Sequence, residues 1–172
     1  YIRSHVRDIP DFPKEGILFR DITPLLARPD GLGLVTDGLV AALTDAKVPV
    51  DAVVGIEARG FIFGAALAVR LGRPFVPVRK PGKLPGRLDR VSYSLEYGEN
   101  VLEMHQASLE RGANVVVVDD LLATGGTAQA ASRLVAAQGA TVSGFAFVIE
   151  LTALSGRALL TGAPIVSLLT YG

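Results

Sequence analysis

The sequence predicts an α/β fold in which helices flank a central parallel β-sheet. Four consecutive valines, residues 115–118, suit a strand that is buried on both faces, as in a parallel sheet covered by helices. Two strand-turn-helix units follow one another along the chain, at residues 53–72 and 115–139. Hydrophobic residues make up 49% of the 172 residues, which is enough for one full core, so one domain is expected.

Composition excludes several function classes. Lysine plus arginine and aspartate plus glutamate each number 17, so the chain has no overall charge that would attract nucleic acid or an anionic membrane. There is no cysteine, which excludes disulfides and thiolate metal sites. Charge-free runs stop short of the ~20 apolar residues that span a bilayer, and no signal peptide is visible. We therefore expect a cytoplasmic location.

The first part of the chain predicts little regular structure. Residues 1–11 suggest a surface arm or short helix, and the apolar stretch Ile17–Phe19 suggests a small edge strand with a loop. Pro24 favours the first turn of a short helix that ends at Ala27. A longer helix opens at Gly31, with Asp30 as its N-cap and an apolar stripe that continues to Ala46.

The middle of the chain predicts two further strands and a hairpin. A strand at 53–56 leads into a helix that ends near Gly72, and Pro77 favours an edge position or a bulge for the next strand, at 74–78. Residues 79–87 hold four cations among two prolines and two glycines, which indicates a mobile cationic loop. Alternation at 91–97 and the return at 101–104 predict a β-hairpin that turns at residues 98–100.

The last third contains the valine strand and its helix. A short helix is expected at 106–111, closed by Gly112, and Gly139 is a natural C′ residue for the helix that follows the valine strand. Residues 145–149 and 165–169 predict strands, and a short broken helix is expected between them.

The turn after the valine strand predicts a site for a sugar phosphate. Residues 123–127 read Ala-Thr-Gly-Gly-Thr and lie between a strand and a helix N-terminus, where backbone N–H groups and the helix dipole favour an anion. Asp119 and Asp120, just upstream, would repel a phosphate, but they can accept hydrogen bonds from the hydroxyls of a sugar attached to it. The motif is not a Walker A loop, because no Gly-Lys-Ser/Thr follows. In the other unit, Arg59 beside Gly60 is also well placed for an anion.

The valine strand, the acid pair and Thr-Gly-Gly-Thr together resemble the phosphoribosyl diphosphate (PRPP) binding motif of type I phosphoribosyltransferases. Four further segments are similar to the adenine phosphoribosyltransferase family, so that the resemblance covers nearly the whole chain. They are Phe12–Pro13 with Arg20–Asp21–Ile22, Arg59–Gly60–Phe61, Arg79–Lys80 with residues 82–86, and residues 93–98.

The resemblance implies the type I phosphoribosyltransferase fold in a single domain, residues 1–172. That fold has a central parallel sheet flanked by helices, a small N-terminal hood (roughly 1–30), a core (31–172) and a flexible β-hairpin loop (roughly 79–103). It also implies an enzyme of purine salvage that makes AMP and diphosphate from adenine and PRPP with Mg²⁺, and that forms a homodimer. The ion would be held mainly by ligand oxygens and water, without a metal site on the protein.

Residue roles are carried over from the same resemblance. The 5′-phosphate would bind Ala123, Thr124, Gly125, Gly126 and Thr127, and the ribose hydroxyls would meet Asp119 and Asp120. The diphosphate would bind Ala58, Arg59 and Gly60, with Lys80 and Lys83 reaching it from the flexible loop. Adenine would bind Leu18, Phe19 and Arg20, with Phe19 stacked on the ring and the backbone near Leu18 and Arg20 reading its edge. The catalytic residues would be Glu96, which handles a proton near N7 of the base, and Arg59.

Two departures from the family pattern stand out. Lys14–Glu15 replaces a commoner proline-bearing pair before Gly16, and Ala58 stands where serine is frequent. Since Ala58 keeps its backbone N–H, only a hydroxyl contact is in question. The resemblance also implies a cis peptide bond between Glu57 and Ala58.

Two alternative functions remain open. The same fold could act on guanine, hypoxanthine or xanthine, although the hood sequence speaks against 6-oxopurines. The chain could instead be a PRPP-binding regulator without catalysis. Such regulators generally add a nucleic-acid-binding surface, and neither a basic helix nor a helix-turn-helix is visible here, while the loop with Glu96 is retained.

Overall fold

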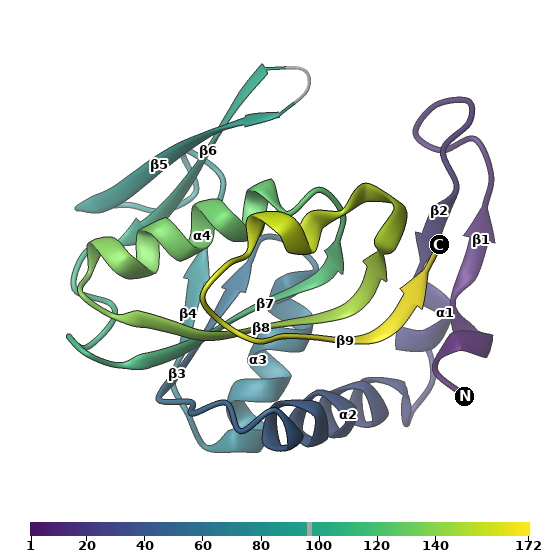
Figure 1. Cartoon of the computed structure of the whole chain (residues 1–172), viewed down its shortest axis with the longest axis horizontal. Coiled ribbons are helices and arrows are strands. Elements are labelled where there is room, and N and C mark those ends of the chain that lie inside the picture. The colour runs from purple at the N-terminus through teal and green to yellow at the C-terminus, as the bar shows by residue number, and fades with distance from the viewer. Residues whose placement is uncertain (96–97) are drawn as a thin grey trace.

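Five parallel strands form the centre of the molecule (Figure 1). The computed structural model describes residues 1–95 and 98–172. In the sheet the strands lie in the order β4-β3-β7-β8-β9. Their bounds are Ala52–Ile56 (β3), Phe75–Val78 (β4), Asn114–Leu122 (β7), Thr141–Leu151 (β8) and Ile165–Tyr171 (β9). The predicted α/β class with a central parallel sheet is confirmed, and Pro77 lies on an edge strand as expected.

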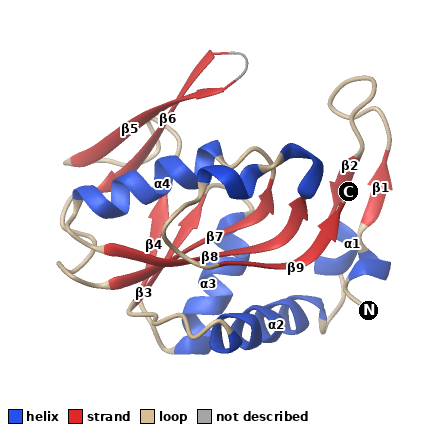
Figure 2. Cartoon of the chain, in the orientation of Figure 1, coloured by secondary structure: helices blue, strands red, loops and turns tan. Residues whose placement is uncertain are grey.

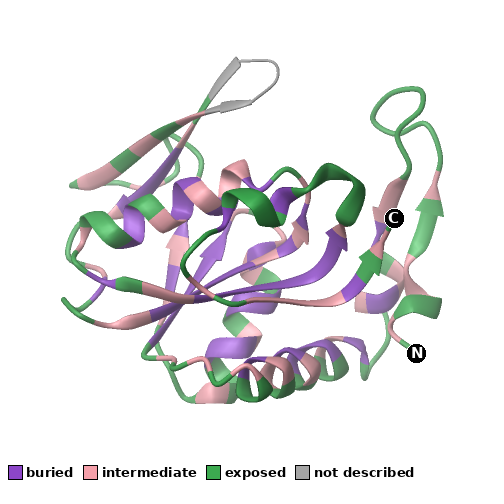
Figure 3. Cartoon of the chain, viewed as in Figure 1, coloured by how far each residue is buried: buried purple, intermediate pink, exposed green. Residues whose placement is uncertain are grey.

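Helices cover both faces of this sheet, as Figure 2 shows. Helices α2 (Gly31–Asp45) and α3 (Gly60–Leu71) lie on one face, and α4 (Gly126–Ala137) lies on the other. Side chains of β7 alternate between the two layers: Val115 and Val117 belong to the core under α4, and Val116 and Val118 belong to the core under α2 and α3. All four are fully buried (Figure 3). The valine run is therefore buried on both faces, as predicted.

Two antiparallel hairpins extend from this core. The N-terminal hood consists of η1 (Arg3–His5), β1 (Arg7–Ile9), β2 (Phe19–Asp21) and α1 (Thr23–Leu26), and it lies beyond the C-terminal end of β9 (Figure 1). The second hairpin, β5 (Leu88–Leu95) with β6 (Gly98–His105), packs on α4. Hood and hairpin thus stand on either side of the C-terminal ends of the parallel strands.

Two local predictions are wrong. Residues 106–111 form turns instead of a helix, with Ala107 at φ 57°. The backbone N–H groups of Ser108 and Leu109 donate to the side-chain oxygen of Gln138, each at 3.0 Å, which replaces helical hydrogen bonds. Residues 98–100, expected to form a turn, belong to strand β6, in which Gly98 pairs with Leu95 of β5.

Other local predictions are confirmed. Gly72 and Gly139 have φ of 63° and 75° after α3 and α4, and glycine is favoured in this left-handed region. The broken helix between the last two strands consists of η2 (Thr152–Leu154) and η3 (Gly156–Leu159). Asp30 occupies the N-cap position of α2, but its carboxylate accepts a hydrogen bond from the Tyr1 hydroxyl instead of capping the helix. Within the described ranges, no helix has the length and apolar character that crossing a bilayer requires.

Candidate active site

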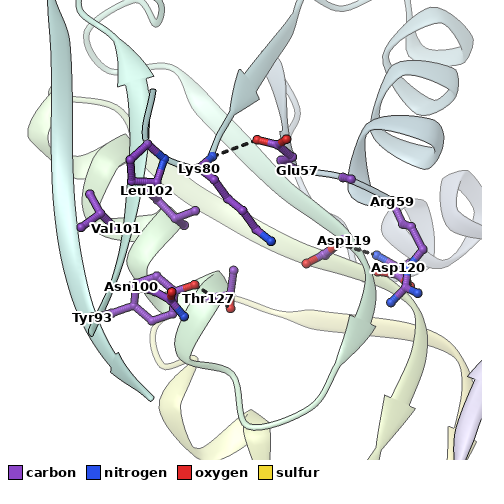
Figure 4. Close-up of a pocket in the computed structure, with 12 residues that line it drawn as sticks. Glu57, Arg59, Lys80, Tyr93, Asn100, Val101, Leu102, Asp119, Asp120 and Thr127 are labelled. Carbon is purple, nitrogen blue, oxygen red and sulfur yellow. Dashed lines mark hydrogen bonds and ion pairs between the residues drawn. The ribbon is translucent and has the colours of Figure 1, made fainter. Parts of the chain in front are cut away.

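A hollow of about 550 Å³ opens at the C-terminal ends of β3, β4 and β7, beside the β5–β6 hairpin (Figure 4). This is the edge at which open α/β sheets bind ligands. Several residues predicted from the sequence line it: Ala58, Arg59, Lys80, Asp119, Asp120 and Thr127. The lining residues are Glu57, Ala58, Arg59, Lys80, Pro81, Tyr93, Asn100, Val101, Leu102, Asp119, Asp120 and Thr127.

The acid pair lies near the end of β7, where Asp120 is buried and Asp119 is partly exposed to the hollow. One carboxylate oxygen of Asp119 accepts a hydrogen bond from the N–H of Asp120 at 2.9 Å. Nε of Arg59 lies 2.6 Å from Oδ2 of Asp120. Burial, followed by the negative charge of Asp120, raises the pKa of Asp119 well above its usual value. Asp119 therefore keeps its proton to a higher pH than an ordinary carboxyl group, and Asp120 carries the charge that pairs with Arg59.

Gly60 brings the first turn of α3 directly against this pair. A Cβ atom at Gly60 would lie 2.7 Å from the carbonyl oxygen of Val118 and 2.9 Å from Oδ1 of Asp119. No larger residue fits without moving one of the two segments. The Glu57–Ala58 peptide bond just before this turn is cis, as predicted; a second cis bond, Phe12–Pro13 in the hood, was not predicted.

The predicted phosphate turn connects β7 to α4. Gly125 has φ 85° and occupies the N-cap position, and the helix begins at Gly126. A small hollow of about 70 Å³ lies here, lined in part by Ala123, Thr124, Gly125 and Thr127. The first N–H groups of a helix have no partner within the helix, so they face an anion placed at this end. The Thr127 hydroxyl donates to the Tyr93 hydroxyl at 3.3 Å and so connects the turn to the hairpin.

The cationic loop reaches the same hollow through Lys80, whose side chain extends toward Asp119 (Figure 4). Its backbone N–H donates to the Glu57 carboxylate at 2.9 Å, and the Arg79 guanidinium donates to the same carboxylate at 3.1 Å. These two contacts, the Lys80 N–H first, lower the pKa of Glu57. Lys83 is not among the described residues that line the hollow. Its carbonyl oxygen accepts a hydrogen bond from the Arg79 guanidinium at 3.3 Å.

A second hollow of about 470 Å³ lies under the hood and is mainly apolar. Phe19 and Phe12 meet edge to face there, with ring centroids 5.1 Å apart. Arg59 lines both hollows, and its guanidinium carbon lies 5.5 Å from the centroid of the Phe19 ring. Leu18 is 44% exposed and does not line this hollow. The side chain of Arg20 turns away to the ring of Tyr171, 4.0 Å from its centroid.

Several lining residues were not identified from the sequence. Tyr93, Asn100, Val101 and Leu102 come from the hairpin, and Glu57 precedes the arginine turn. Their local patterns indicate only strands and a turn, so the tertiary arrangement alone places them at the site. Glu96, predicted to handle the proton, lies outside the described residues.

Comparison with known proteins identifies the family. A model of the phosphoribosyl transferase domain matches residues 35–158. The adenine phosphoribosyltransferase of Sorangium cellulosum (strain So ce56) is 56% identical over 176 residues, covering 99% of this chain and 87% of that protein. The crystal structure of adenine phosphoribosyltransferase from Thermoanaerobacter pseudethanolicus matches with a TM-score of 0.95 and 48% identity, covering 99% of this chain and 98% of that one.

A third match was crystallised with two ligands. The adenine phosphoribosyltransferase of Saccharomyces cerevisiae, crystallised with an imino-altritol bisphosphate and adenine, matches with a TM-score of 0.93 and 42% identity, covering 98% of this chain and 96% of that one. Since the domain model spans most of the chain and a relative is 56% identical along nearly all of it, the chain belongs to the adenine phosphoribosyltransferase family.

Proposed function

We propose that this chain transfers the 5-phosphoribosyl group from PRPP to adenine, giving AMP and diphosphate in purine salvage. One observation carries the proposal: the hollow lined by the acid pair, Arg59 and Lys80 shares Asp119 and Thr127 with the small hollow at the phosphate turn, and Arg59 also lines an apolar pocket with Phe19. A phosphorylated sugar with an anionic leaving group and a planar apolar base is the combination of ligands that these surfaces suit.

The ribose 5-phosphate part would bind along the end of β7. Residues 123–127 offer backbone N–H groups and the threonine hydroxyls to the 5′-phosphate. Asp119 and Asp120 would take hydrogen bonds from the ribose hydroxyls. The raised pKa of Asp119 favours its protonated form, and in that form the pair could donate to a ribose oxygen as well as accept.

The diphosphate would lie between Ala58–Gly60 and Lys80, with Lys83 joining from the loop. Cleavage of the bond from C1 to diphosphate leaves an oxocarbenium-like sugar, as in glycoside chemistry, and the departing group gathers negative charge. Positively charged groups at fixed positions stabilise that charge without reorganising. To bind the diphosphate, Arg59 would either leave Asp120 or bond to both groups at once. Its guanidinium has five N–H donors in a fixed planar arrangement, which makes bonding to both possible.

Adenine would enter the hood pocket, where Phe19 would stack on its ring and the backbone at Leu18 and Arg20 would read its edge. The yeast relative was crystallised with adenine, which supports the choice of base. The edge-to-face contact of Phe12 with Phe19 fixes the plane of the Phe19 ring. Two points stay predictions: that Glu96 handles the proton, and that the enzyme prefers adenine to 6-oxopurines.

Mg²⁺ would accompany PRPP. In the described part of the chain, no three acidic or histidine side chains gather closely enough to form a metal site. Carboxylate oxygens are the donors that Mg²⁺ prefers, but Asp120 is already paired with Arg59. We therefore propose that the oxygens of PRPP and water supply most ligands. When bound, the ion would neutralise charge on the departing diphosphate.

A homodimer and a cytoplasmic location are also proposed. The surface formed by α2 and α3 supports the dimer, because it holds an apolar hollow of about 820 Å³ and leaves Val69 83% exposed. Large exposed apolar patches mark association surfaces. Light scattering on the purified chain and on Val69→Asp tests this: a dimer that the substitution converts to a monomer is expected, and a monomeric parent chain would refute it.

The decisive experiment measures AMP formation from PRPP and Mg²⁺ with adenine, hypoxanthine or guanine in parallel. We expect turnover with adenine alone. Turnover with the oxopurines would keep the PRPP site and remove the proposed base pocket. PRPP binding without turnover, lost in Asp119→Asn/Asp120→Asn, would favour the regulator.

A further inference from the structure

The short helix η3 lies in direct backbone contact with the phosphate turn. A Cβ atom at Gly156 would lie 2.2 Å from the carbonyl oxygen of Ala123 and 3.0 Å from the nitrogen of Gly125. Conversely, a Cβ atom at Gly125 would lie 2.5 Å from the carbonyl oxygen of Gly156. Both positions thus require glycine, because the two segments approach each other more closely than any side chain allows. A side chain at either position would push the turn and η3 apart.

An ion pair holds η3 in this position. The Arg157 guanidinium donates to both oxygens of the Glu150 carboxylate, at 2.6 and 2.7 Å, and its third contact is the carbonyl oxygen of Ile165 at 3.0 Å. Glu150 is only 4% exposed, and Arg157 lowers its pKa. A bidentate pair with a buried carboxylate fixes the orientation of the arginine as well as its distance. Gly156, adjacent in sequence, is thereby fixed to β8 and β9.

The other end of η3 is connected to α4. Nε2 of Gln129, in the first turn of α4, donates to the carbonyl oxygen of Leu159 at 3.2 Å. The phosphate turn is therefore enclosed between its own strand, its own helix and a segment held by a buried ion pair. A turn with two adjacent glycines is otherwise conformationally free, and that freedom would be lost when an anion bound.

We propose that Gly156, held in place by the Arg157–Glu150 ion pair, positions the turn at residues 123–127 so that its N–H groups converge on the 5′-phosphate before the ligand arrives. This inference rests on the proposed function, since it assumes that the turn binds a phosphate monoester. Gly156 and Arg157 are positioning residues. Their effect falls on ligands that carry the 5′-phosphate and leaves adenine recognition unchanged, because among the described residues none lines both the hood pocket and the hollow at the turn.

The test compares Gly156→Ala and Arg157→Lys with the parent chain. Ala158→Ser is the matched control, since Ala158 is exposed on the same short helix. Titration calorimetry gives the Kd of ribose 5-phosphate, steady-state kinetics give the KM of PRPP and of adenine separately, and circular dichroism checks folding. For Gly156→Ala we expect the Kd of ribose 5-phosphate and the KM of PRPP to rise about tenfold or more, with the KM of adenine within about twofold. Arg157→Lys, which loses the bidentate geometry, should give a smaller rise in the same two constants.

The outcomes separate the inference from the function. Folded variants with unchanged affinity for ribose 5-phosphate would overturn the inference, and so would equal increases in the two KM values, which indicate general damage. If Gly156→Ala does not fold, Arg157→Lys decides by the same criteria. If the parent chain makes no AMP but binds ribose 5-phosphate, and the variants weaken that binding, the proposed function fails while the inference stands. A parent chain that does not bind ribose 5-phosphate would overturn both.

Discussion

Nε of Arg59 lies 2.6 Å from Oδ2 of Asp120, and this ion pair connects the two strand-turn-helix units of the fold. Arg59 follows β3 and Asp120 lies near the end of β7, so the pair joins the proposed diphosphate turn to the proposed ribose acids. The same guanidinium lies 5.5 Å from the ring centroid of Phe19 in the hood. Arg59 is therefore the residue at which the base, ribose and diphosphate regions meet.

Arg59→Lys is expected to lower kcat/KM by roughly 100-fold. An ammonium group offers a point charge with rotatable donors in place of a planar fork, so it does not hold Asp120 and a diphosphate oxygen in one fixed geometry. The loss of one charge-assisted hydrogen bond is worth about 1.5–3 kcal/mol, and each 1.36 kcal/mol is tenfold in rate. Initial-rate kinetics measure the change. Arg133→Lys, an exposed arginine on α4 that contacts Gln129, is the control. A variant within about twofold of the parent would remove Arg59 from the chemistry.

Asp119→Asn should make the protein more stable at neutral pH while it weakens activity. The folded-state pKa of Asp119 is raised, so the unfolded chain ionises first as pH rises above 3.8, and stability then falls until the folded-state pKa is passed. Asparagine removes that cost and keeps an oxygen that can accept from the N–H of Asp120.

Thermal unfolding of parent and Asp119→Asn chains from pH 3 to pH 8 tests this. We expect a midpoint about 2–4 °C higher for the variant at neutral pH, equivalent to about 1 kcal/mol, with the difference disappearing near pH 3. A variant that is less stable than the parent at neutral pH would contradict the raised pKa. Activity at neutral pH should fall, as is common when a destabilising site residue is replaced.

Features that depend on neighbouring residues in the sequence were predictable. Contacts between residues far apart in the sequence were not. The valine run, the glycine-rich turn and the edge proline follow from periodicity and backbone conformation, which act within a few residues. The side chain of Arg20 illustrates the limit: the predicted role uses the backbone of this residue, and no local pattern indicates that its guanidinium stacks on Tyr171, 151 positions later in the numbering. Local pattern cannot indicate which distant ring will be adjacent.

The contact of Gly156 with the phosphate turn shows the same limit. In the sequence Gly156 reads as a break in a short helix, whereas the structure requires it because Ala123 and Gly125 lie against it. The wrong helix at residues 106–111 has a similar cause, since Gln138 supplies a hydrogen-bond acceptor that no local pattern includes. The sequence motifs indicated where the turn and the acids lie. They did not indicate which distant residues hold these segments in position.

Asp21→Asn should destabilise the chain clearly at pH 6 and much less at pH 2. Hydrogen bonds from the Thr23 hydroxyl and backbone N–H, and then from Arg7, lower the pKa of Asp21 from 3.8 to about 2. Because the folded-state pKa is lowered, the stabilisation is complete above 3.8 and is lost as pH falls toward 2.

Thermal midpoints from pH 6 to pH 2 measure this effect of Asp21. Hydrogen bonds to a charged group are worth about 1.5–3 kcal/mol, so the variant should unfold several degrees earlier at pH 6, by about 2–4 °C per kcal/mol. Asp45→Asn, at an exposed position at the end of α2, serves as the control and should change little. Equal differences for Asp21→Asn at pH 6 and pH 2 would show that its charge is not involved.

Tyr171→Ala is expected to impair adenine use alone. The ring of Tyr171, at the end of β9, lies 4.0 Å from the Arg20 guanidinium and 4.6 Å from that of Arg3. The Arg20 side chain is only 14% exposed and also forms an ion pair with Asp8, so it connects both hood strands to the core. Phe19, the proposed stacking residue, is its neighbour on β2. Loss of the ring would therefore free the hood to shift relative to the phosphate turn, which belongs to a different part of the core.

Cation–π contacts are worth about 0.5–2 kcal/mol, so the KM of adenine should rise by about twofold to thirtyfold in Tyr171→Ala while the KM of PRPP stays the same. Tyr171→Phe keeps the ring face and should restore the parent value. A general loss of stability would raise both KM values or lower only the amount of folded enzyme, so the split between the substrates distinguishes hood positioning from unfolding. Equal KM values for adenine in Tyr171→Ala and the parent would show that the hood keeps its place without this ring.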